Sequence, residues 1–160
     1  MTVNLLRSRG RLAECDFARL AIALARMRQK RRFLLTALVL LPDHWHAIIY
    51  PPHPVCISPV LSGAKVSSMT AINRGRHEKG ELWQERFFDH ALRTVRNYGE
   101  TVEYIHLNPV RRGLVKRPAE WKWSSFAEYS GLGAAEQEKR CGLTIDRVRL
   151  PANEKVRYLS

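Results

Sequence analysis

The stretch Phe33–Tyr50, FLLTALVLLPDHWHAIIY, decides the fold because it contains two strand-like runs joined by a short turn. Its first half, through Leu41, is an unbroken apolar run, which is typical of a strand buried on both faces. Pro42-Asp43 is a turn-forming pair, and His44–Tyr50 then has the length and composition of an antiparallel partner strand. We therefore predict a β-hairpin.

Two histidines flank a tryptophan at the start of the second predicted strand. Successive side chains of a strand point to opposite faces, so His44 and His46 would share one face while Trp45 enters the other. Two imidazoles on one face can hold a metal ion. A pair with this spacing can equally lie on an exposed face with no function. The pair alone leaves both interpretations open.

The remaining periodicity predicts helices on either side of the hairpin and further extended segments. Prolines at positions 51, 52 and 54 end the second hairpin strand, since proline has no amide to donate. The predicted strands are Thr2–Leu6 and the extended segments 82–83 and 87–92. The predicted helices are 12–29, a helix from Ser58 to about Gly75, and a helix capped by Thr94 that ends at Pro109 and Gly113.

The helix after Thr94 carries two stripes at about 100° per residue. The apolar stripe would face the core and consists of Val95, Tyr98, Val102 and Ile105. The polar stripe lies off that seam and consists of Asn97, Thr101, Tyr104 and Asn108. Tyr104 and Asn108 are one turn apart, which places a phenol and an amide on the same face. Together with the histidine pair, this spacing suggests a metal-assisted tyrosine nucleophile.

Asn108 is the natural third ligand of such a metal if its helix docks beside the hairpin. Two imidazoles and an amide oxygen suit Mg²⁺ or Mn²⁺ assisted by phosphate oxygens, whereas zinc would want more nitrogen or sulfur ligands. His53 and Cys56 follow the hairpin closely, but the prolines between them and the single thiol argue against a zinc site. His90 and His106 are predicted to be surface or helix-flank residues.

The charge of the chain favours a polyanionic partner. Its 160 residues carry 27 Lys and Arg against 15 Asp and Glu, a net charge of +12. Basic charge drives association with phosphates through counterion release, although it does not distinguish nucleic acid from anionic lipid or a ribosomal neighbour. The residues predicted to contact DNA phosphates, each of which could also be a solvated surface charge, are Lys65, Arg74, Arg76, Lys79, Arg86 and Arg93.

Composition also limits the class of protein and its organisation. No apolar stretch reaches the roughly 18 residues of a membrane span, and no signal peptide is visible. The three cysteines are widely spaced, which indicates neither a disulfide framework nor a thiolate zinc site. We predict one domain over residues 1–130 and a peripheral basic tail over 131–160. An aromatic cluster would close the core rather than stack on bases: Trp121, Trp123, Phe126 and Tyr129.

Several ordered segments resemble the motifs of REP-associated tyrosine transposases, a branch of the single-tyrosine HUH transposases. The resemblance spans about residues 34–129 and rests on the segments LPDHWH at 41–46, GELWQ at 80–84, YIHLNPV at 104–110 with GLV at 113–115, and WSS at 123–125. One departure is that Met1 lies almost at the first predicted strand, where family members usually have a longer leading segment.

The resemblance implies an α+β fold, with a ferredoxin-like or RRM-like antiparallel sheet flanked by helices. The HUH motif would lie on a central strand and the tyrosine on a helix. His44, His46 and Asn108 would be metal ligands and Tyr104 the nucleophile. The family's substrate is single-stranded DNA folded as a repetitive extragenic palindrome hairpin, and cleavage leaves a 5′-phosphotyrosine and a 3′-hydroxyl. No small-molecule substrate and no membrane partner are expected. A monomer is favoured over a dimer. The protein is expected in the cytoplasm, associated with the nucleoid.

The leading prediction is therefore a metal-dependent transposase or endonuclease that cleaves and rejoins single-stranded hairpin DNA through Tyr104. Because the pKa of a phenol is about 10, the attack needs activation by the metal or by a nearby base. The alternative is a non-catalytic module that binds single-stranded nucleic acid, in which the histidines and the tyrosine are relicts. A covalent protein–DNA adduct would separate the two.

Overall fold

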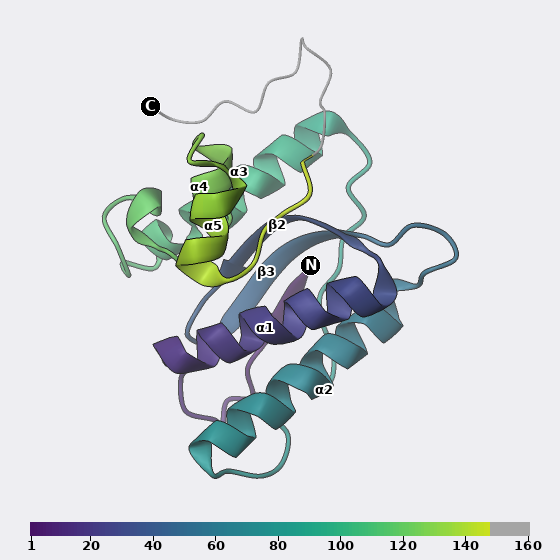
Figure 1. The fold of residues 1–160 in the computed structure, drawn as a ribbon, viewed down its shortest axis with the longest axis vertical. Helices are drawn as coiled ribbons and strands as arrows, with labels where there is room; N and C mark the ends of the chain where they lie inside the picture. Colours follow the sequence, from purple (N-terminus) through teal and green to yellow (C-terminus); the bar gives the residue numbers. More distant parts are fainter. Residues whose placement is uncertain (148–160) are drawn as a thin grey trace.

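The predicted hairpin forms two adjacent strands of an antiparallel sheet in the computed structural model, which describes residues 1–147 (Figure 1). β2 (Leu34–Leu40) pairs with β3 (His44–Tyr50), and the amide of Leu41 donates to the carbonyl of His44 across the turn. β1 (Thr2–Asn4) pairs with the other edge of β3, giving the order β1-β3-β2 in the described sheet. β3, which carries the two histidines, is therefore the middle strand.

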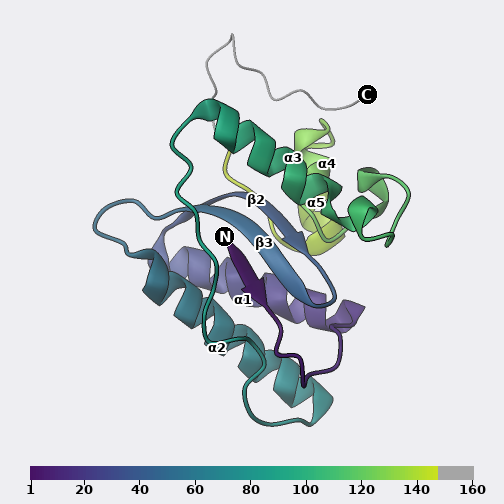
Figure 2. The same cartoon turned by 180° about the vertical axis from the view of Figure 1, so that it is seen from behind.

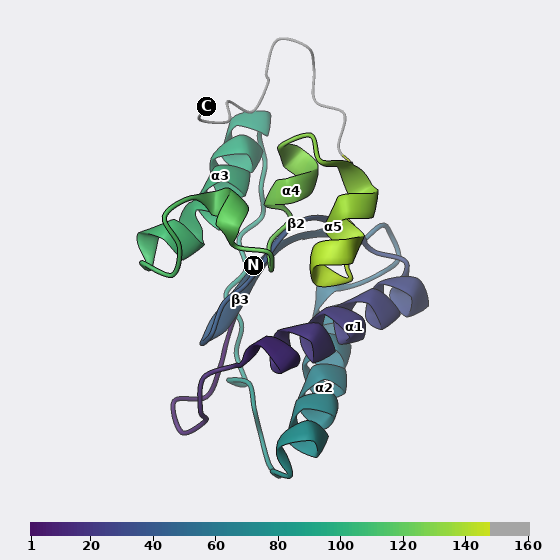
Figure 3. The same ribbon diagram turned by 60° about the vertical axis from the view of Figure 1, so that its left-hand side comes forward.

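Helices lie on both faces of the sheet (Figure 3), and each face buries its own apolar core. α1 (Glu14–Arg31) and α2 (Ile57–Arg76) cover one face, where Trp45 is fully buried in the larger core. α3 (Val95–Arg111) covers the other face, and its Val102 and Ile105 pack in the smaller core against β2 and β3. The predicted α+β architecture, an antiparallel sheet flanked by helices, is confirmed.

A buried carboxylate joins the start of α1 to the end of α2. Asp16 is 1% exposed and accepts hydrogen bonds from the Ala13 amide at 2.9 Å and from Arg76 Nη2 at 2.7 Å, with Arg19 Nη1 at 3.1 Å. Burial alone would raise the pKa of Asp16, but these hydrogen bonds and the charge of Arg76 outweigh it and lower the pKa below its ordinary value. The two helices are thus joined by a fully satisfied ion pair.

The strand predicted at 87–92 is not formed as a strand. The connection between α2 and α3 runs alongside β1 (Figure 2), where it makes only the isolated bridges Thr2–Phe88 and Leu5–Trp83. The Thr2 amide donates to the Phe88 carbonyl at 2.7 Å, and the Phe88 amide donates back at 3.0 Å. The two bridges are not in the same register, so the pairing with β1 is interrupted between Trp83 and Phe88.

The prediction of a peripheral tail from residue 131 was wrong for the residues up to Arg147. η1 (Pro118–Glu120) and α4 (Phe126–Tyr129) lead into α5 (Gly133–Cys141), after which Leu143 and Ile145 are buried in the larger core. Asp146 then fixes the segment to β2, since its Oδ2 accepts from the Leu35 amide at 2.8 Å. The rest of the predicted tail, residues 148–160, lies outside the described residues.

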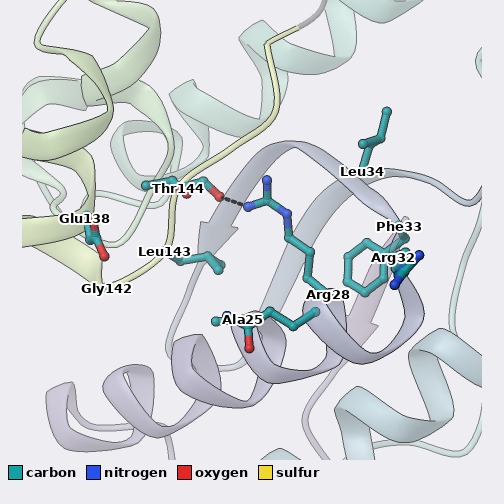
Figure 4. Close-up of a pocket in the computed structure, with 10 residues that line it drawn as sticks. Ala25, Arg28, Arg32, Phe33, Leu34, Glu138, Gly142, Leu143 and Thr144 are labelled. Atoms are coloured by element: carbon teal, nitrogen blue, oxygen red, sulfur yellow. Dashed lines mark hydrogen bonds between the residues drawn. The ribbon is translucent and has the colours of Figure 1, made fainter.

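A cavity of about 530 Å³ lies between the end of α1 and the segment after α5 (Figure 4). Arg28 crosses it and donates to the Thr144 carbonyl at 2.6 Å and to Asp146 at 2.6 Å. These bonds hold the segment after α5 against α1.

The predicted aromatic cluster packs rather than forming an open stacking surface. Phe17 of α1 meets Trp121 edge-on at 5.9 Å between ring centroids, and it meets Trp123 at 5.5 Å. The Tyr129 hydroxyl donates to the Thr36 carbonyl of β2 at 2.6 Å.

Within residues 1–147, no helix is both long enough and apolar enough to cross a bilayer.

Candidate active site

β3 and α3 bring the two histidines, Tyr104 and Asn108 together. His44 and His46 are buried on the sheet face that α3 covers, and their Nε2 atoms lie 3.0 Å apart. Asn108 Nδ2 lies 3.2 Å from His46 Nε2. The Tyr104 ring stands edge-on to the His46 ring at 5.4 Å between centroids. The structure therefore joins the four residues that the sequence singled out from two distant segments.

The apolar seam of α3 sets the orientation of its polar stripe. Val102 and Ile105 are buried against Ala37, Val39 and Ile48, which rotates the neighbouring stripe toward the start of β3. Asn108 is 4% exposed there, whereas Tyr104 remains 44% exposed at the rim. A buried amide and an accessible phenol one helical turn apart follow from this arrangement.

Two further residues contact the histidine pair and a third contacts one of these two, and sequence analysis missed all of them. Asp43 Oδ1 lies 2.6 Å from His44 Nδ1, and Arg112 Nη1 donates to the other oxygen of that carboxylate at 2.8 Å. The Thr2 hydroxyl lies 2.8 Å from His46 Nδ1. The position of Asp43 directly before His44 was a usable signal. Thr2 and Arg112 gave none, because only strand pairing and the end of α3 bring them here.

Both histidines are neutral near pH 7. Burial lowers the pKa of His44, against the opposing effect of the Asp43 carboxylate. Burial, followed by the charges of His44, the N-terminus and Arg112, lowers the pKa of His46 from 6.5 to about 3. A neutral imidazole keeps a lone pair on one nitrogen, which is the form that binds metals.

The donor set fits a divalent cation. Asn108 Oδ1 is buried without a hydrogen-bond partner, and the oxygen and nitrogen ends of an amide can exchange by rotation. One imidazole pair and one amide oxygen can therefore converge on a point beside Tyr104. Within residues 1–147, no group of three or more His, Cys, Asp or Glu side chains is arranged to hold a metal. Any ion here depends on the amide and on ligands from the substrate.

The prediction that His106 is a surface or helix-flank residue was wrong, although His90 is exposed. His106 is 2% exposed, and its Nε2 lies 2.8 Å from the Ser125 hydroxyl. Its ring also meets those of Phe126 and Tyr129. His106 lies two residues after Tyr104 and points to another side of α3, which the segment after η1 covers. It therefore anchors the helix rather than facing solvent.

The buried state of His106 predicts a pH-dependent stability. Burial lowers the pKa of His106 to about 3, below the ordinary 6.5 that the unfolded chain recovers. The unfolded state then binds more protons between these values, so this contribution is complete above about pH 6.5 and is lost as the pH falls toward 3. Its slope is at most about 1.4 kcal/mol per pH unit. Urea unfolding at pH 7 and pH 5 should show a smaller pH effect in His106→Gln than in the parent. An equal effect would contradict the assignment.

Two of the six predicted DNA contacts are engaged inside the protein. Lys65 donates to the carbonyls of Gln84 and Glu85 at 2.6 and 2.8 Å, and Arg76 pairs with buried Asp16. These contacts favour structural roles for both. The other four side chains are exposed and stay predicted DNA contacts: Arg74, Lys79, Arg86 and Arg93.

Two cavities flank the candidate site. One of about 580 Å³ is basic, with Arg7, Arg9 and Arg11 in its lining, and it reaches Asp43 beside His44. The other, of about 650 Å³, is mainly apolar. Its lining includes Ile48, two residues after His46, and Thr101, one helical turn before Tyr104. The site therefore has space on both sides along the sheet.

Comparisons with known proteins place the chain among DNA transposases. A family model described as "Transposase IS200 like" matches residues 7–108. The chain is 32% identical over 134 residues to a REP-associated tyrosine transposase of Escherichia coli strain K12, covering 78% of this chain and 73% of the relative. It is 28% identical over 104 residues to a putative REP-associated tyrosine transposase of Haemophilus influenzae, covering 59% of each.

A solved structure of a REP-associated tyrosine transposase bound to a REP hairpin is also similar. Its TM-score to this chain is 0.73 at 27% sequence identity. The match covers 99% of this chain and 90% of the other. The likeness therefore extends over the whole fold.

Proposed function

The chain belongs to the IS200-like transposase family, and from that premise we propose that it cleaves and rejoins single-stranded hairpin DNA through Tyr104. The observation that carries this proposal is the convergence of both imidazole Nε2 atoms and the Asn108 amide beside an exposed phenol. The similar solved structure of a REP-associated tyrosine transposase bound to a REP hairpin also supports the proposal.

The chemistry is a phosphoryl transfer to tyrosine. The Tyr104 oxygen attacks phosphorus, the bond to the 3′ oxygen breaks, and the products are a 5′-phosphotyrosine and a free 3′-hydroxyl. Because the phosphodiester bond energy is kept in the tyrosyl link, a 3′-hydroxyl of another strand can reverse the attack and join the strands. His44, His46 and Asn108 would hold Mg²⁺ or Mn²⁺, which when bound supplies positive charge to the reacting phosphate.

Cationic side chains around the phenol suit a phosphate-bearing substrate. The Arg111 guanidinium lies 5.4 Å from the centre of the Tyr104 ring, and Arg112 is held on Asp43 beside His44. The basic cavity with Arg7 and Arg11 continues from Asp43 along the surface. With a net charge of +12, these groups favour a DNA strand passing over the site.

Label position tests the proposed cleavage. A single-stranded REP-type hairpin with single-stranded flanks is incubated with the protein and Mg²⁺ or Mn²⁺, and products are separated under denaturing conditions. A label at the 3′ end should migrate with the protein, whereas a label at the 5′ end should appear on a free fragment. Binding without any adduct would instead support the non-catalytic module. An adduct that retains the 5′ label would contradict the proposed polarity.

Removing a metal ligand should weaken Mn²⁺ binding. His44→Ala and His46→Ala each take away an imidazole, and at least about a tenfold loss of Mn²⁺ affinity is expected. Mutating a residue that only hydrogen-bonds to a metal ligand already lowers metal affinity typically about 10–100-fold. Asn108→Ala should have a smaller effect. The matched control is His77→Asn, which removes an exposed imidazole at a left-handed position that asparagine tolerates. Mn²⁺ titration followed by electron paramagnetic resonance measures the affinities. Parent-like binding in all three variants would show that the metal site is misassigned.

A further inference from the structure

The two histidines of the site differ in the group that contacts their Nδ1 atom, the ring nitrogen that faces away from the other histidine. His44 Nδ1 faces the Asp43 carboxylate at 2.6 Å, whereas His46 Nδ1 faces the Thr2 hydroxyl at 2.8 Å. A carboxylate can only accept a hydrogen bond, but a hydroxyl can donate or accept. This difference controls which ring nitrogen of each histidine carries the proton.

His44 is restricted to one tautomer. Since Asp43 only accepts, the proton of the neutral ring must lie on Nδ1, and Nε2 then carries the lone pair. Arg112 donates to the second oxygen of Asp43 at 2.8 Å and keeps that carboxylate ionised and in place. Arg112 caps α3, so the helix that carries Tyr104 also supports the orientation of His44.

His46 requires a different tautomer in the metal-free site. Two lone pairs 3.0 Å apart repel each other, so one proton must lie between the two Nε2 atoms. His44 already has its proton on Nδ1, and therefore the shared proton belongs to His46 Nε2. The end of the Asn108 amide that lies 3.2 Å from His46 Nε2 must then be Oδ1, which has no hydrogen-bond partner in the other orientation, because an amide nitrogen cannot accept from an N–H. His46 Nδ1 is then an acceptor, and the Thr2 hydroxyl donates to it.

A cation bound between the rings needs both Nε2 lone pairs. We propose that Thr2 is a positioning residue that allows His46 to exchange its Nε2 proton for an Nδ1 proton when a divalent cation binds. Asp43 and Arg112 meanwhile keep His44 in one tautomer. One proton leaves Nε2, one is taken up at Nδ1 of the same ring from water, and the ring stays neutral. The Thr2 hydroxyl rotates from donor to acceptor. This inference rests on the metal site of the proposed function.

Strand pairing fixes the position of Thr2 independently of its hydroxyl. Thr2 lies opposite His46 in the β1–β3 ladder, and its amide and carbonyl both bond to Phe88 on the other side. Valine has the same branched shape as threonine and suits a strand. Thr2→Val should therefore keep the fold and remove only the polar contact to His46.

Nitrogen-detected NMR of the imidazole rings tests this directly, without any DNA or activity. In the metal-free parent, His46 should be the Nε2–H tautomer and His44 the Nδ1–H tautomer. Saturation with Zn²⁺, a diamagnetic ion that binds imidazole, should convert His46 to Nδ1–H and leave the His44 tautomer unchanged. Mn²⁺ affinity should fall at least about tenfold in Thr2→Val, which is the usual loss when a residue hydrogen-bonded to a metal ligand is mutated. The affinity should recover in Thr2→Ser. The control Thr70→Val removes a hydroxyl from α2 and should bind Mn²⁺ like the parent.

The outcomes separate this inference from the proposed function. If Zn²⁺ perturbs both rings but His46 has the same tautomer with and without it, the role of Thr2 is wrong and the metal site stands. Parent-like Mn²⁺ affinity in Thr2→Val, or no recovery in Thr2→Ser, likewise overturns the role of Thr2. If Zn²⁺ perturbs neither ring, the metal site itself fails and the inference fails with it.

Discussion

Replacing Tyr104 with phenylalanine is expected to abolish the covalent DNA adduct, with a loss of at least about 10³-fold in the rate of cleavage. The substitution removes only the attacking oxygen. The ring keeps its edge-on contact with His46 and its place beside Arg111, so the fold and the metal ligands should be unaffected. Denaturing gel electrophoresis of the labelled hairpin measures the adduct, and Mn²⁺ titration checks the metal site.

The matched control is Tyr50→Phe, which removes the hydroxyl of another exposed tyrosine, at the opposite end of β3 from His44. Tyr50 is 60% exposed at the end of β3 and lines the apolar cavity beside Ile48. It should form the adduct at the parent rate. Adduct formation that survives in Tyr104→Phe and disappears in Tyr50→Phe would show that the nucleophile is misassigned. Peptide mass spectrometry of the adduct then identifies the modified residue.

Asp16→Asn is expected to lower the free energy of unfolding by about 3–5 kcal/mol, the usual effect of removing one partner of a buried ion pair. The substitution keeps the shape of the side chain but leaves Arg76, whose side chain is 15% exposed, with only the more distant and more exposed carboxylate of Glu78 at 3.9 Å. It weakens the junction between α1 and α2, the two helices that cover the larger core on one face of the sheet. Urea denaturation at pH 7 measures the change.

The Asp16 carboxylate also makes the free energy of unfolding fall at acidic pH. Its pKa is lowered on folding, so its contribution is present above the unfolded value of 3.8 and is lost as the pH falls through the lower folded value. The control Glu100→Gln breaks a pair with Arg96 whose side chains are 60% and 86% exposed, and it should leave the unfolding curve unchanged. A loss below about 1 kcal/mol in Asp16→Asn would refute the assigned role of Asp16.

Strong periodicity made much of the fold predictable. The hairpin and the helices over 14–31, 57–76 and 95–111 were found to within a few residues, because each has a long buried stripe or an apolar run. The errors lie where the pattern is short or polar. α5 offers few apolar residues, and its burial depends on Cys141 and on Leu143 and Ile145 just beyond it. Tertiary contacts, rather than local sequence, decide such a segment.

The four central residues of the site were predictable because each pair has the period of its own element. His44 and His46 have the spacing of a strand face, and Tyr104 and Asn108 have the spacing of a helical turn. Charge was a weaker guide. Lys65 and Arg76 have the residue type of DNA contacts but bond within the protein. Thr2 carries no local signal, since only the β1–β3 register brings it to His46.

Because the sheet divides the protein interior in two, amino-acid substitutions on its two faces should have different effects. Residues between the sheet and helices α1 and α2, such as Leu20 and Leu61, lie on the opposite face of the sheet from the candidate site, so changes there alter how much folded protein a cell accumulates. Residues under α3, such as Ile48 and Ile105, set the depth and tilt of the helix that presents Tyr104. Changes there alter the chemistry of the protein that does fold. A deep mutational scan that records abundance and cleavage separately would therefore divide the sequence by sheet face.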